Sequence, residues 1–461
     1  MDGERIMPER SLNTRQVASM LASTSCGIGF LLGTGELALY QGMVGCVYAL
    51  ASALGLAILA VCSSALWNAG RSIWGLFGQL YGPSVSHSAA LLSLIWMTGA
   101  LGAQIRGGSA ILALSGLPET VALPLIASIL IGLSLVRLSW LSAGLAICML
   151  GCGTMLVSAL LETGGIGVWL HAPMLFADAM RQTSLGRVGI TVTSVVAMVI
   201  CGADYQQFVI AADKPSAART GCLVAAGFVF IIGFLPASAV IAARSFWHLN
   251  EVSDPAEVVP ILLMRSLSDS MASNVVIALL SAATLGAGCA ILRAMSEVVA
   301  AIGPQSVRRP ISSRILPVVL SLLVAARGQS LVDMMVDLNM VYLAAVGPLL
   351  VLRLLRLRVC DIAANTSMAA GCGIALSCYL LRWMGVISLP SGATTLLSLL
   401  IALVLAIARH NHTVSPYRDS EHPKRSLWLT LMSQRRFLLP YQVPQGTTEP
   451  DSVERDTSRF R

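Results

Sequence analysis

The chain has 461 residues, of which 56% are hydrophobic and only 11% are charged, and its mean hydropathy is +0.78. Because soluble domains carry about 25% charged residues, this composition excludes an ordinary soluble protein and predicts an all-α membrane protein. The net charge of +7 is explained by arginines in loops and indicates no nucleic-acid partner. The 11 cysteines are scattered through apolar stretches, which favours packing over a disulfide framework, a metal site or another cofactor.

Twelve apolar stretches, each close to the roughly 20 residues that cross a bilayer, follow a polar segment at residues 1–16. We expect transmembrane helices near 17–40, 43–67, 86–105, 119–136, 138–161, 187–208, 218–244, 270–299, 313–327, 329–354, 362–382 and 388–409. Residues 410–461 form a polar tail. Within it, 426–443 is apolar with a basic pair, which predicts either a helix lying on the membrane surface or a disordered segment with an apolar patch.

Basic residues are more frequent in the connections on one side of these helices, among them Arg308, Arg309 and Arg314. Because short cytoplasmic loops carry an excess of lysine and arginine, we expect this side to face the cytoplasm. An even number of helices then places both termini in the cytoplasm. The predicted location is the inner (cytoplasmic) membrane, with membrane lipid around a multi-pass bundle.

The first apolar stretch contains GIGFLLGTGELALYQG (residues 27–42), with five glycines and one carboxylate. Each glycine weakens a helix by roughly 1 kcal/mol relative to alanine and lets another backbone or a ligand approach closely. A helix broken near the middle of the membrane, as in the binding sites of many secondary transporters, is one interpretation. Tight helix packing through small residues is the other. The first interpretation assigns Gly29, Phe30, Gly33 and Thr34 to a site for a solute or coupling ion.

The carboxylate of this stretch is Glu36. An acidic side chain within a membrane is costly unless it faces a partner or a water-filled cavity, so it is functional by default. We expect Glu36 to carry a proton or to balance the charge of a cationic solute, and a position near the outer aqueous boundary is the alternative. The aromatic residues Phe30, Trp96 and Tyr342 are candidates for the walls of a cavity or for packing.

Three segments occur in a characteristic order: residues 13–60, which include TRQVASMLASTSCGIGFLLGTGELALYQ; GADYQQFVIAADKPSAARTG (202–221); and AAVGPLLVLRLLRLRVCDIAANTSMAAGCG (344–373). Together they resemble the sodium/solute symporter family. The resemblance implies the leucine-transporter architecture, in which two inverted repeats of five helices each begin with a broken helix. It implies a ten-helix core at 17–355 and two additional C-terminal transmembrane helices at 356–409.

The second of these segments contains Asp204. In the family, this pattern lies at the inner end of the sixth core helix. The resemblance therefore implies that Asp204 is a gate or helix-end residue, and a carboxylate at a solvated helix end is the alternative. No aromatic residue precedes Tyr205 in this helix, which argues against a sugar as the solute.

The eighth stretch departs from the family, whose members typically coordinate sodium here through consecutive serine or threonine hydroxyls. The corresponding positions in this chain are Leu285 and Gly286, which have no side-chain oxygen. Ser281 and Thr284 lie one turn apart on one helix face and are candidates to replace the missing ligands. Alternatively, their hydroxyls bond to the backbone of their own helix. The coupling ion is therefore left open between sodium and a proton.

The resemblance implies a secondary active transporter, a symporter that moves a small hydrophilic solute across the cytoplasmic membrane by alternating access. One alternative is a sodium-independent facilitator. Another is a degenerate transporter that acts as a membrane sensor or scaffold through a partner of the tail. We expect no enzyme activity, because the nucleotide-binding motif G-x-x-x-x-G-K-[ST] does not occur and no paired catalytic groups are expected at membrane depth.

Overall fold

The structure is a computed structural model of the chain. It describes residues 10–136, 138–183, 185–244, 246–249, 252, 254–266, 270–303, 309–328, 330–354, 357, 359–387 and 391–410. The tail and the surface helix predicted at 426–443 lie outside the described residues. Within the described residues, the secondary structure is helical apart from an isolated bridge between Leu12 and Ala212, as the composition predicts.

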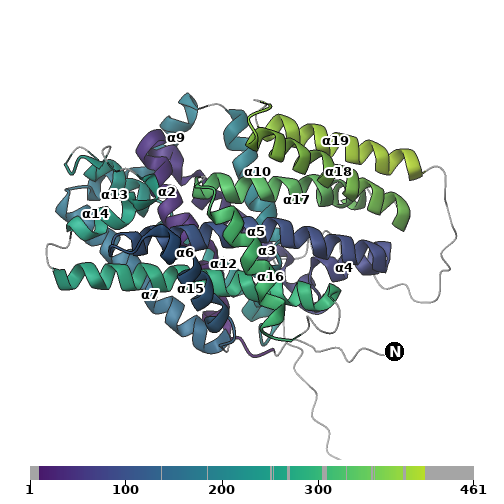
Figure 1. Ribbon diagram of the computed structural model, residues 1–461, viewed down its shortest axis with the longest axis horizontal. Helices are drawn as coiled ribbons and strands as arrows, with labels where there is room; N and C mark the ends of the chain where they lie inside the picture. The colour runs from purple at the N-terminus through teal and green to yellow at the C-terminus, as the bar shows by residue number, and fades with distance from the viewer. Residues whose placement is uncertain are drawn as a thin grey trace, which may run out of the picture. The chain divides into compact units, whose positions relative to one another are not determined.

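The helical elements, labelled in Figure 1, cover most of the described chain. In chain order they are α1 (Thr14–Ser25), α2 (Ile28–Gln41), η1 (Gly42–Cys46), α3 (Val47–Ala69), α4 (Ile73–Tyr81), α5 (Pro83–Ala113), α6 (Glu119–Leu133), α7 (Leu138–Glu162), α8 (Ile166–Leu170), α9 (Ala172–Gln182), α10 (Leu185–Cys201), α11 (Ala203–Ile210), α12 (Pro215–Ile232), α13 (Leu235–Ala243), η3 (Pro255–Glu257), α14 (Val258–Ser266), α15 (Ser270–Ile302), α16 (Ser312–Ala325), α17 (Leu331–Leu354), α18 (Asp361–Trp383) and α19 (Ser391–His410).

Seven helical stretches in the described part of the chain are long and apolar enough to cross a membrane, judged by length and composition, and four shorter apolar helices accompany them. One of the seven, Phe30–Ala69, covers the second half of the helix expected at 17–40 and the whole of that expected at 43–67. Each of the twelve expected helices therefore corresponds to an apolar helical stretch of the structure. This agreement follows from the bilayer, since its thickness fixes the length of a spanning helix.

Local sequence explains where several of these helices begin and end. The Asn13 side chain accepts a hydrogen bond from the Gln16 N–H and the Gln16 side chain accepts one from the Asn13 N–H, which forms a capping box at the start of α1. Pro83 and Pro215 occupy the first turns of α5 and α12, where proline lacks only an N–H that would be free anyway. Gly70 ends α3 in the left-handed conformation, with φ of 58°.

The membrane helices of the core form two groups. Helices α1, α3, α10 and α12 pack against one another, and α5, α6, α15 and α16 pack against one another. Helix α17 contacts both α5 and α10. The arrangement leaves a boundary between the two groups, and the candidate site described below lies at this boundary.

Helices α18 and α19 pack against each other and against α17, and the three lie side by side in the green-to-yellow part of Figure 1. The contact between α17 and α18 brings two backbones together. A Cβ on Gly371 would lie only 2.3 Å from the carbonyl oxygen of Ala344, so only glycine fits there. The two additional C-terminal helices predicted from the sequence are thus present and attached through α17.

Candidate functional site

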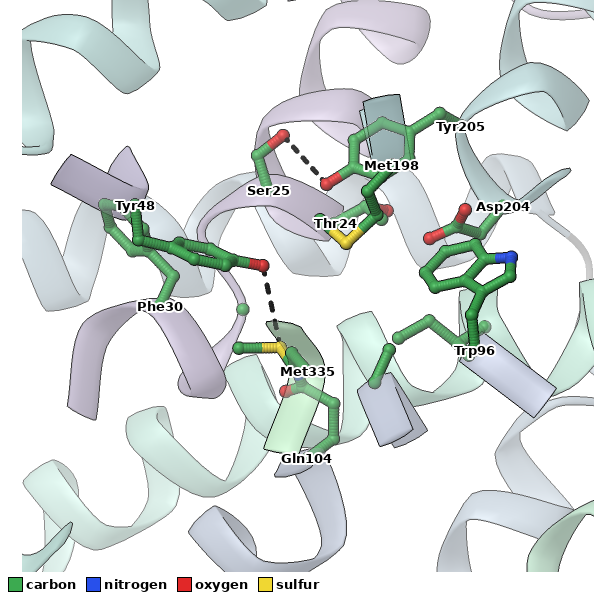
Figure 2. A pocket seen from close by; sticks show the side chains of 13 residues that line it. Thr24, Ser25, Phe30, Tyr48, Trp96, Gln104, Met198, Asp204, Tyr205 and Met335 are labelled. Carbon is green, nitrogen blue, oxygen red and sulfur yellow. Dashed lines mark hydrogen bonds between the residues drawn. The ribbon is translucent and has the colours of Figure 1, made fainter. Parts of the chain in front are cut away.

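Two helices of the core are broken, and their breaks lie next to each other. The first break separates α1 from α2 at Cys26 and Gly27, and the second separates α10 from α11 at Gly202. The Ser25 hydroxyl, at the end of α1, donates to the hydroxyl oxygen of Tyr205 in α11 at 3.4 Å. Both breaks therefore border the same space, as Figure 2 shows.

This space is a small cavity with about 10 Å³ of open volume. It is lined by residues from both helix groups and from α17. The lining residues are Thr24, Ser25, Gly27, Phe30, Tyr48, Trp96, Ala100, Gln104, Met198, Asp204, Tyr205, Ile291 and Met335.

The first break lies close to α5 and α15, which is possible because Gly27 has no side chain. A Cβ on Gly27 would lie 2.8 Å from the Cβ of Ala287 and 2.9 Å from Nε2 of Gln104. The carbonyl of Gly27 accepts hydrogen bonds from the N–H groups of Phe30 and Leu31 at 2.9 and 3.1 Å, which starts α2. Because a break ends one helix and begins another, backbone groups at its edges lack partners within the helices, and here those edges face the cavity.

The second break is stabilised by the two glutamines of the GADYQQ segment. The Gln206 side chain donates from Nε2 to the Ile200 carbonyl at 2.9 Å and accepts at Oε1 from the Ile73 N–H at 2.8 Å. The Gln207 side chain donates from Nε2 to the carbonyl of Ala290 on α15 at 3.1 Å. The first glutamine thus satisfies backbone groups near the break, and the second ties α11 to the other helix group.

Asp204 lies in the first turn of α11 and lines the cavity. Its side chain is 2% exposed, and its Oδ1 atom has no hydrogen-bond partner. A carboxylate in the first turn of a helix is favoured by the helix dipole, but the burial excludes the solvated helix end that the sequence left as an alternative. Asp204 is the only carboxylate among the lining residues.

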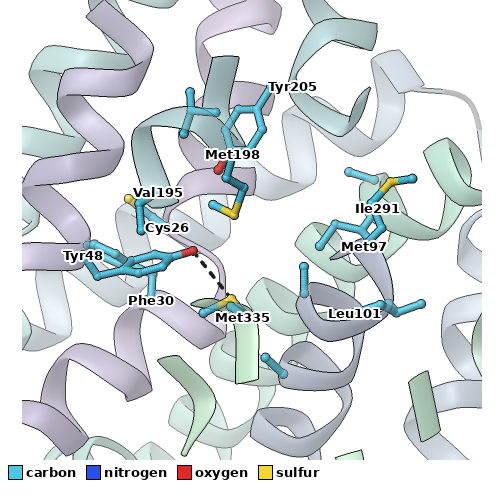
Figure 3. Packing of buried hydrophobic residues seen from close by; sticks show 14 of the residues in the cluster. Cys26, Phe30, Tyr48, Met97, Leu101, Val195, Met198, Tyr205, Ile291 and Met335 are labelled. Carbon is cyan, nitrogen blue, oxygen red and sulfur yellow. Dashed lines mark hydrogen bonds between the residues drawn. The ribbon is translucent and has the colours of Figure 1, made fainter. Parts of the chain in front are cut away.

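The rest of the wall is aromatic and sulfur-rich. Tyr48 and Met335 face each other across the cavity, with the tyrosine hydroxyl 3.6 Å from the sulfur, and Met198 lies nearby in Figure 3. The Trp96 ring packs against that of Tyr342, with 6.3 Å between the ring centroids. Two further lining atoms, Thr24 Oγ1 and Trp96 Nε1, are buried without a hydrogen-bond partner. Buried polar atoms are almost always hydrogen-bonded, so these two atoms and Asp204 Oδ1 are available to a polar ligand in the cavity.

The residues predicted in the first stretch are divided between the cavity and the helix interfaces. Phe30 lines the cavity. Gly33 faces α17, since a Cβ there would lie 2.6 Å from Cγ2 of Val332. Thr34 is fully buried, and its hydroxyl has no hydrogen-bond partner, but it is not a lining residue. Gly29 lies in the first turn of α2, and its role at a site stays a prediction.

Glu36 joins α2 to α17 and is not a lining residue of the cavity. Its Oε2 atom accepts a hydrogen bond from the N–H of Leu331, the first residue of α17, at 3.4 Å. Asp254 and Asp333 lie close enough to interact with it electrostatically. Glu36 is thus a contact between α2 and the start of α17, and its predicted role as a proton carrier or counter-charge stays a prediction.

The α15 hydroxyls also lie away from the cavity. The Thr284 hydroxyl donates to the Leu280 carbonyl of its own helix at 2.9 Å, and its methyl group faces Gly108 of α5. The Ser281 hydroxyl has no hydrogen-bond partner and is not a lining residue. The α15 side chains at the breaks are instead Ala287 and Ile291. Like Leu285 and Gly286, they have no oxygen, so the described residues of α15 offer a sodium ion no side-chain ligand at the first break.

Several lining residues could not be singled out from the sequence, among them Thr24, Ser25, Tyr48 and Gln104. Asp204, by contrast, was singled out through the segment at residues 202–221, in which Gly202 precedes it by two residues.

No protein-family model matches the sequence, and no curated protein is similar to it in sequence. Solved structures are similar in fold. One is a substrate-bound, outward-open Na+-coupled sialic acid symporter, with a TM-score of 0.69 and 13% identity over 89% of this chain and 92% of that chain.

A second is Mhp1, a nucleobase-cation-symport-1 family transporter in a closed conformation with bromovinylhydantoin bound, with a TM-score of 0.55 and 15% identity over 88% of this chain and 93% of that chain. A third is MhsT in complex with L-phenylalanine, with a TM-score of 0.56 and 15% identity over 87% of this chain and 98% of that chain. These likenesses confirm the fold that the sequence resemblance implies.

Proposed function

We propose that the chain is a secondary active transporter that moves a small hydrophilic solute across the cytoplasmic membrane by alternating access. The observation that carries the proposal is the meeting of two helix breaks at one buried cavity with three unpartnered polar atoms. Such breaks offer half-helix ends to a ligand near the middle of the membrane. The similar solved structures named above are transporters with this fold, which supports the same function here.

The packing of the core suggests how access would alternate. Thr24, Tyr48 and Asp204 come from the group containing α1, α3 and α10, with α11 continuing α10 after its break, whereas Trp96 and Ile291 come from the group containing α5 and α15. The cavity therefore lies between two internally packed bodies. A rocking motion of one group against the other would open the cavity to one side of the membrane and then to the other.

The coupling ion would be a proton, or none would be needed. This part of the proposal rests on α15, where the side chains at the first break are Ala287 and Ile291 and provide no oxygen. Sodium binding would have to rely on backbone carbonyls and on side chains of the other helices. Thermal unfolding in sodium chloride and in potassium chloride of equal concentration tests the point, because only a sodium site gives a sodium-specific rise in melting temperature.

Uptake by the purified protein in liposomes tests transport itself. The probes are radiolabelled mixtures of small amines, amino acids and polyols, and we expect saturable uptake of at least one of them. Ala100→Phe fills the cavity and should abolish this uptake, whereas Ala369→Phe, on the exposed surface of α18, should retain it. Uptake that is equal in the two variants, or no uptake of any probe, would contradict the proposal.

Deletion of residues 411–461 separates transport from a sensor or scaffold that acts through its tail. A transporter keeps its uptake when the tail is removed. A scaffold loses its function, and its full-length form shows no uptake.

A further inference from the structure

Asp204 is the only charged side chain among the thirteen that line the cavity. None of the salt bridges between described residues includes it, and Oδ1 has no hydrogen-bond partner. A carboxylate removed from water is costly unless a positive charge or strong donors compensate it. The protein surrounding Asp204 therefore leaves room for one positive charge that a ligand would supply.

The walls of the cavity favour an organic cation over a metal ion. Four aromatic side chains line it: Phe30, Tyr48, Trp96 and Tyr205. Aromatic faces attract ammonium and guanidinium groups, and the thioether of a methionine adapts to an irregular ligand. A hard cation such as sodium instead needs several oxygen ligands, and the Ser25 and Tyr205 hydroxyls already bond to each other.

Two more lining atoms define the hydrogen bonds that a ligand would make. Thr24 Oγ1 can accept a hydrogen bond but has no partner in the protein, and the Trp96 Nε1–H is a donor without an acceptor. Asp204 Oδ1 is a second acceptor. A ligand that matches all three carries N–H donors on its charged group and one acceptor oxygen elsewhere. In this conformation the open space in the cavity is about 10 Å³, roughly the room for one water molecule. The ligand is therefore limited to a small molecule, and the walls must move apart to admit it.

We propose that the transported solute is a small organic cation, a protonated amine with one hydrogen-bond acceptor. Its ammonium group donates to Asp204 and Thr24 between the aromatic side chains, and its acceptor binds the Trp96 indole N–H. This inference rests on the proposed transport function and names the class of solute that the cavity takes.

Matched sets of small molecules test the proposal. The probes are ethanolamine, 3-amino-1-propanol and 4-amino-1-butanol, each compared with the diol and the hydroxy acid of the same chain length. Binding is measured by the rise in melting temperature of the detergent-purified protein, and transport by uptake into liposomes. We expect an amino alcohol to bind and to be taken up, and the uncharged diols and anionic hydroxy acids to be at least tenfold weaker.

Asp204→Asn keeps the shape of the side chain and removes its charge. Because a hydrogen bond to a charged group is worth more than a neutral one, the variant should bind the amino alcohol roughly 10- to 100-fold more weakly. Its melting temperature without ligand should equal or exceed that of the wild type, since it no longer buries a charge. Asp178→Asn, at an exposed position of α9, is the matched control and should bind as the wild type does.

The possible failures are distinguishable. Equal amine binding by the wild type and Asp204→Asn, or preferred uptake of a diol or hydroxy acid, overturns the assignment of an organic cation and leaves transport standing. A sodium-specific thermal stabilisation that Asp204→Asn abolishes assigns the carboxylate to sodium and also overturns it. No uptake of amines, diols or hydroxy acids overturns the proposed function together with the inference.

Discussion

Replacement of Gly27 by alanine tests whether the first break depends on close contact with α15. The backbone of Gly27 has φ of −56° and ψ of 174°, which alanine adopts without strain. The effect of Gly27→Ala is therefore steric. The new Cβ would lie 2.8 Å from the Cβ of Ala287, about 1 Å closer than the roughly 3.5–4.0 Å at which carbon atoms attract each other best. The break must then move away from α15.

Overpacking of this kind costs about 1–3 kcal/mol of unfolding free energy, and we expect Gly27→Ala to lose that amount. Ala287→Gly removes the opposing methyl group and by itself costs about 1 kcal/mol, because it places glycine inside a helix. In the double variant the two losses should not add, since the collision with Ala287 no longer occurs and only the end of the flexible Gln104 side chain still has to shift. The coupling should be about 1 kcal/mol or more.

The four proteins are compared by equilibrium unfolding in mixed micelles, followed by tryptophan fluorescence. Amine binding is measured in parallel, because Gly27 lines the cavity and a shifted break should also weaken binding. Restored stability and binding in the double variant would confirm the contact. Losses that simply add in the double variant would refute the reasoning.

Two further predictions concern contacts of α17. Glu36→Ala should lower the unfolding free energy by about 1 kcal/mol, because the N–H of Leu331 loses its acceptor at the start of the helix. Glu36→Gln keeps an acceptor oxygen and should change the unfolding free energy little. Equal losses in the two variants would contradict this role. Gly371→Ala should cost about 1–3 kcal/mol because its Cβ meets the Ala344 carbonyl. Gly373→Ala, two residues away in open space, should be neutral or stabilising by up to about 1 kcal/mol, and equal effects of the two alanines in the unfolding assay would exclude the backbone contact.

The membrane helices could be predicted because the property that defines them is local. A run of about 20 apolar residues indicates a helix that crosses the bilayer, whatever its neighbours are. Each expected helix corresponds to an apolar helical stretch, although those at 17–40, 187–208 and 218–244 are each divided into two helices. The position of the first break could be placed only within 27–42, since this stretch holds five glycines. The break occurs at Gly27, where Ala287 of α15 and Gln104 of α5 lie close. These neighbours are separated from it by many residues in the sequence, so the sequence does not single this glycine out.

The orientation of single polar side chains could not be predicted for the same reason. Successive residues of a helix are about 100° apart around its axis, as 3.6 residues per turn require. A small error in the predicted rotation of the helix therefore moves a side chain from the cavity to a helix interface. Thr284 was a candidate ligand of a coupling ion, with a bond to its own helix as the alternative; in the structure its methyl group faces Gly108 and its hydroxyl donates to Leu280 of its own helix. Asp204 lies in the first turn of α11, as a helix-end residue would, yet it is only 2% exposed, which the sequence could not foresee.

An organic cation as solute would also explain why α15 needs no sodium ligands. A membrane potential of 100 mV, negative inside, favours the entry of one positive charge by about 2.3 kcal/mol, which corresponds to roughly 50-fold accumulation. A chain that carries a cation against Asp204 can use this potential directly. An uncharged solute would gain nothing from the potential and would need a coupling ion.

The prediction is that liposomes with a potassium diffusion potential set by valinomycin, negative inside, accumulate the amino alcohol without any sodium gradient. Reversing the potential should expel it, and a sodium gradient at zero potential should have no effect. Accumulation driven by a pH gradient at zero potential would instead indicate a proton as the coupling ion. Accumulation driven by sodium at zero potential would contradict the reasoning from Ala287 and Ile291, because a sodium site would then exist without a side-chain oxygen from this face of α15.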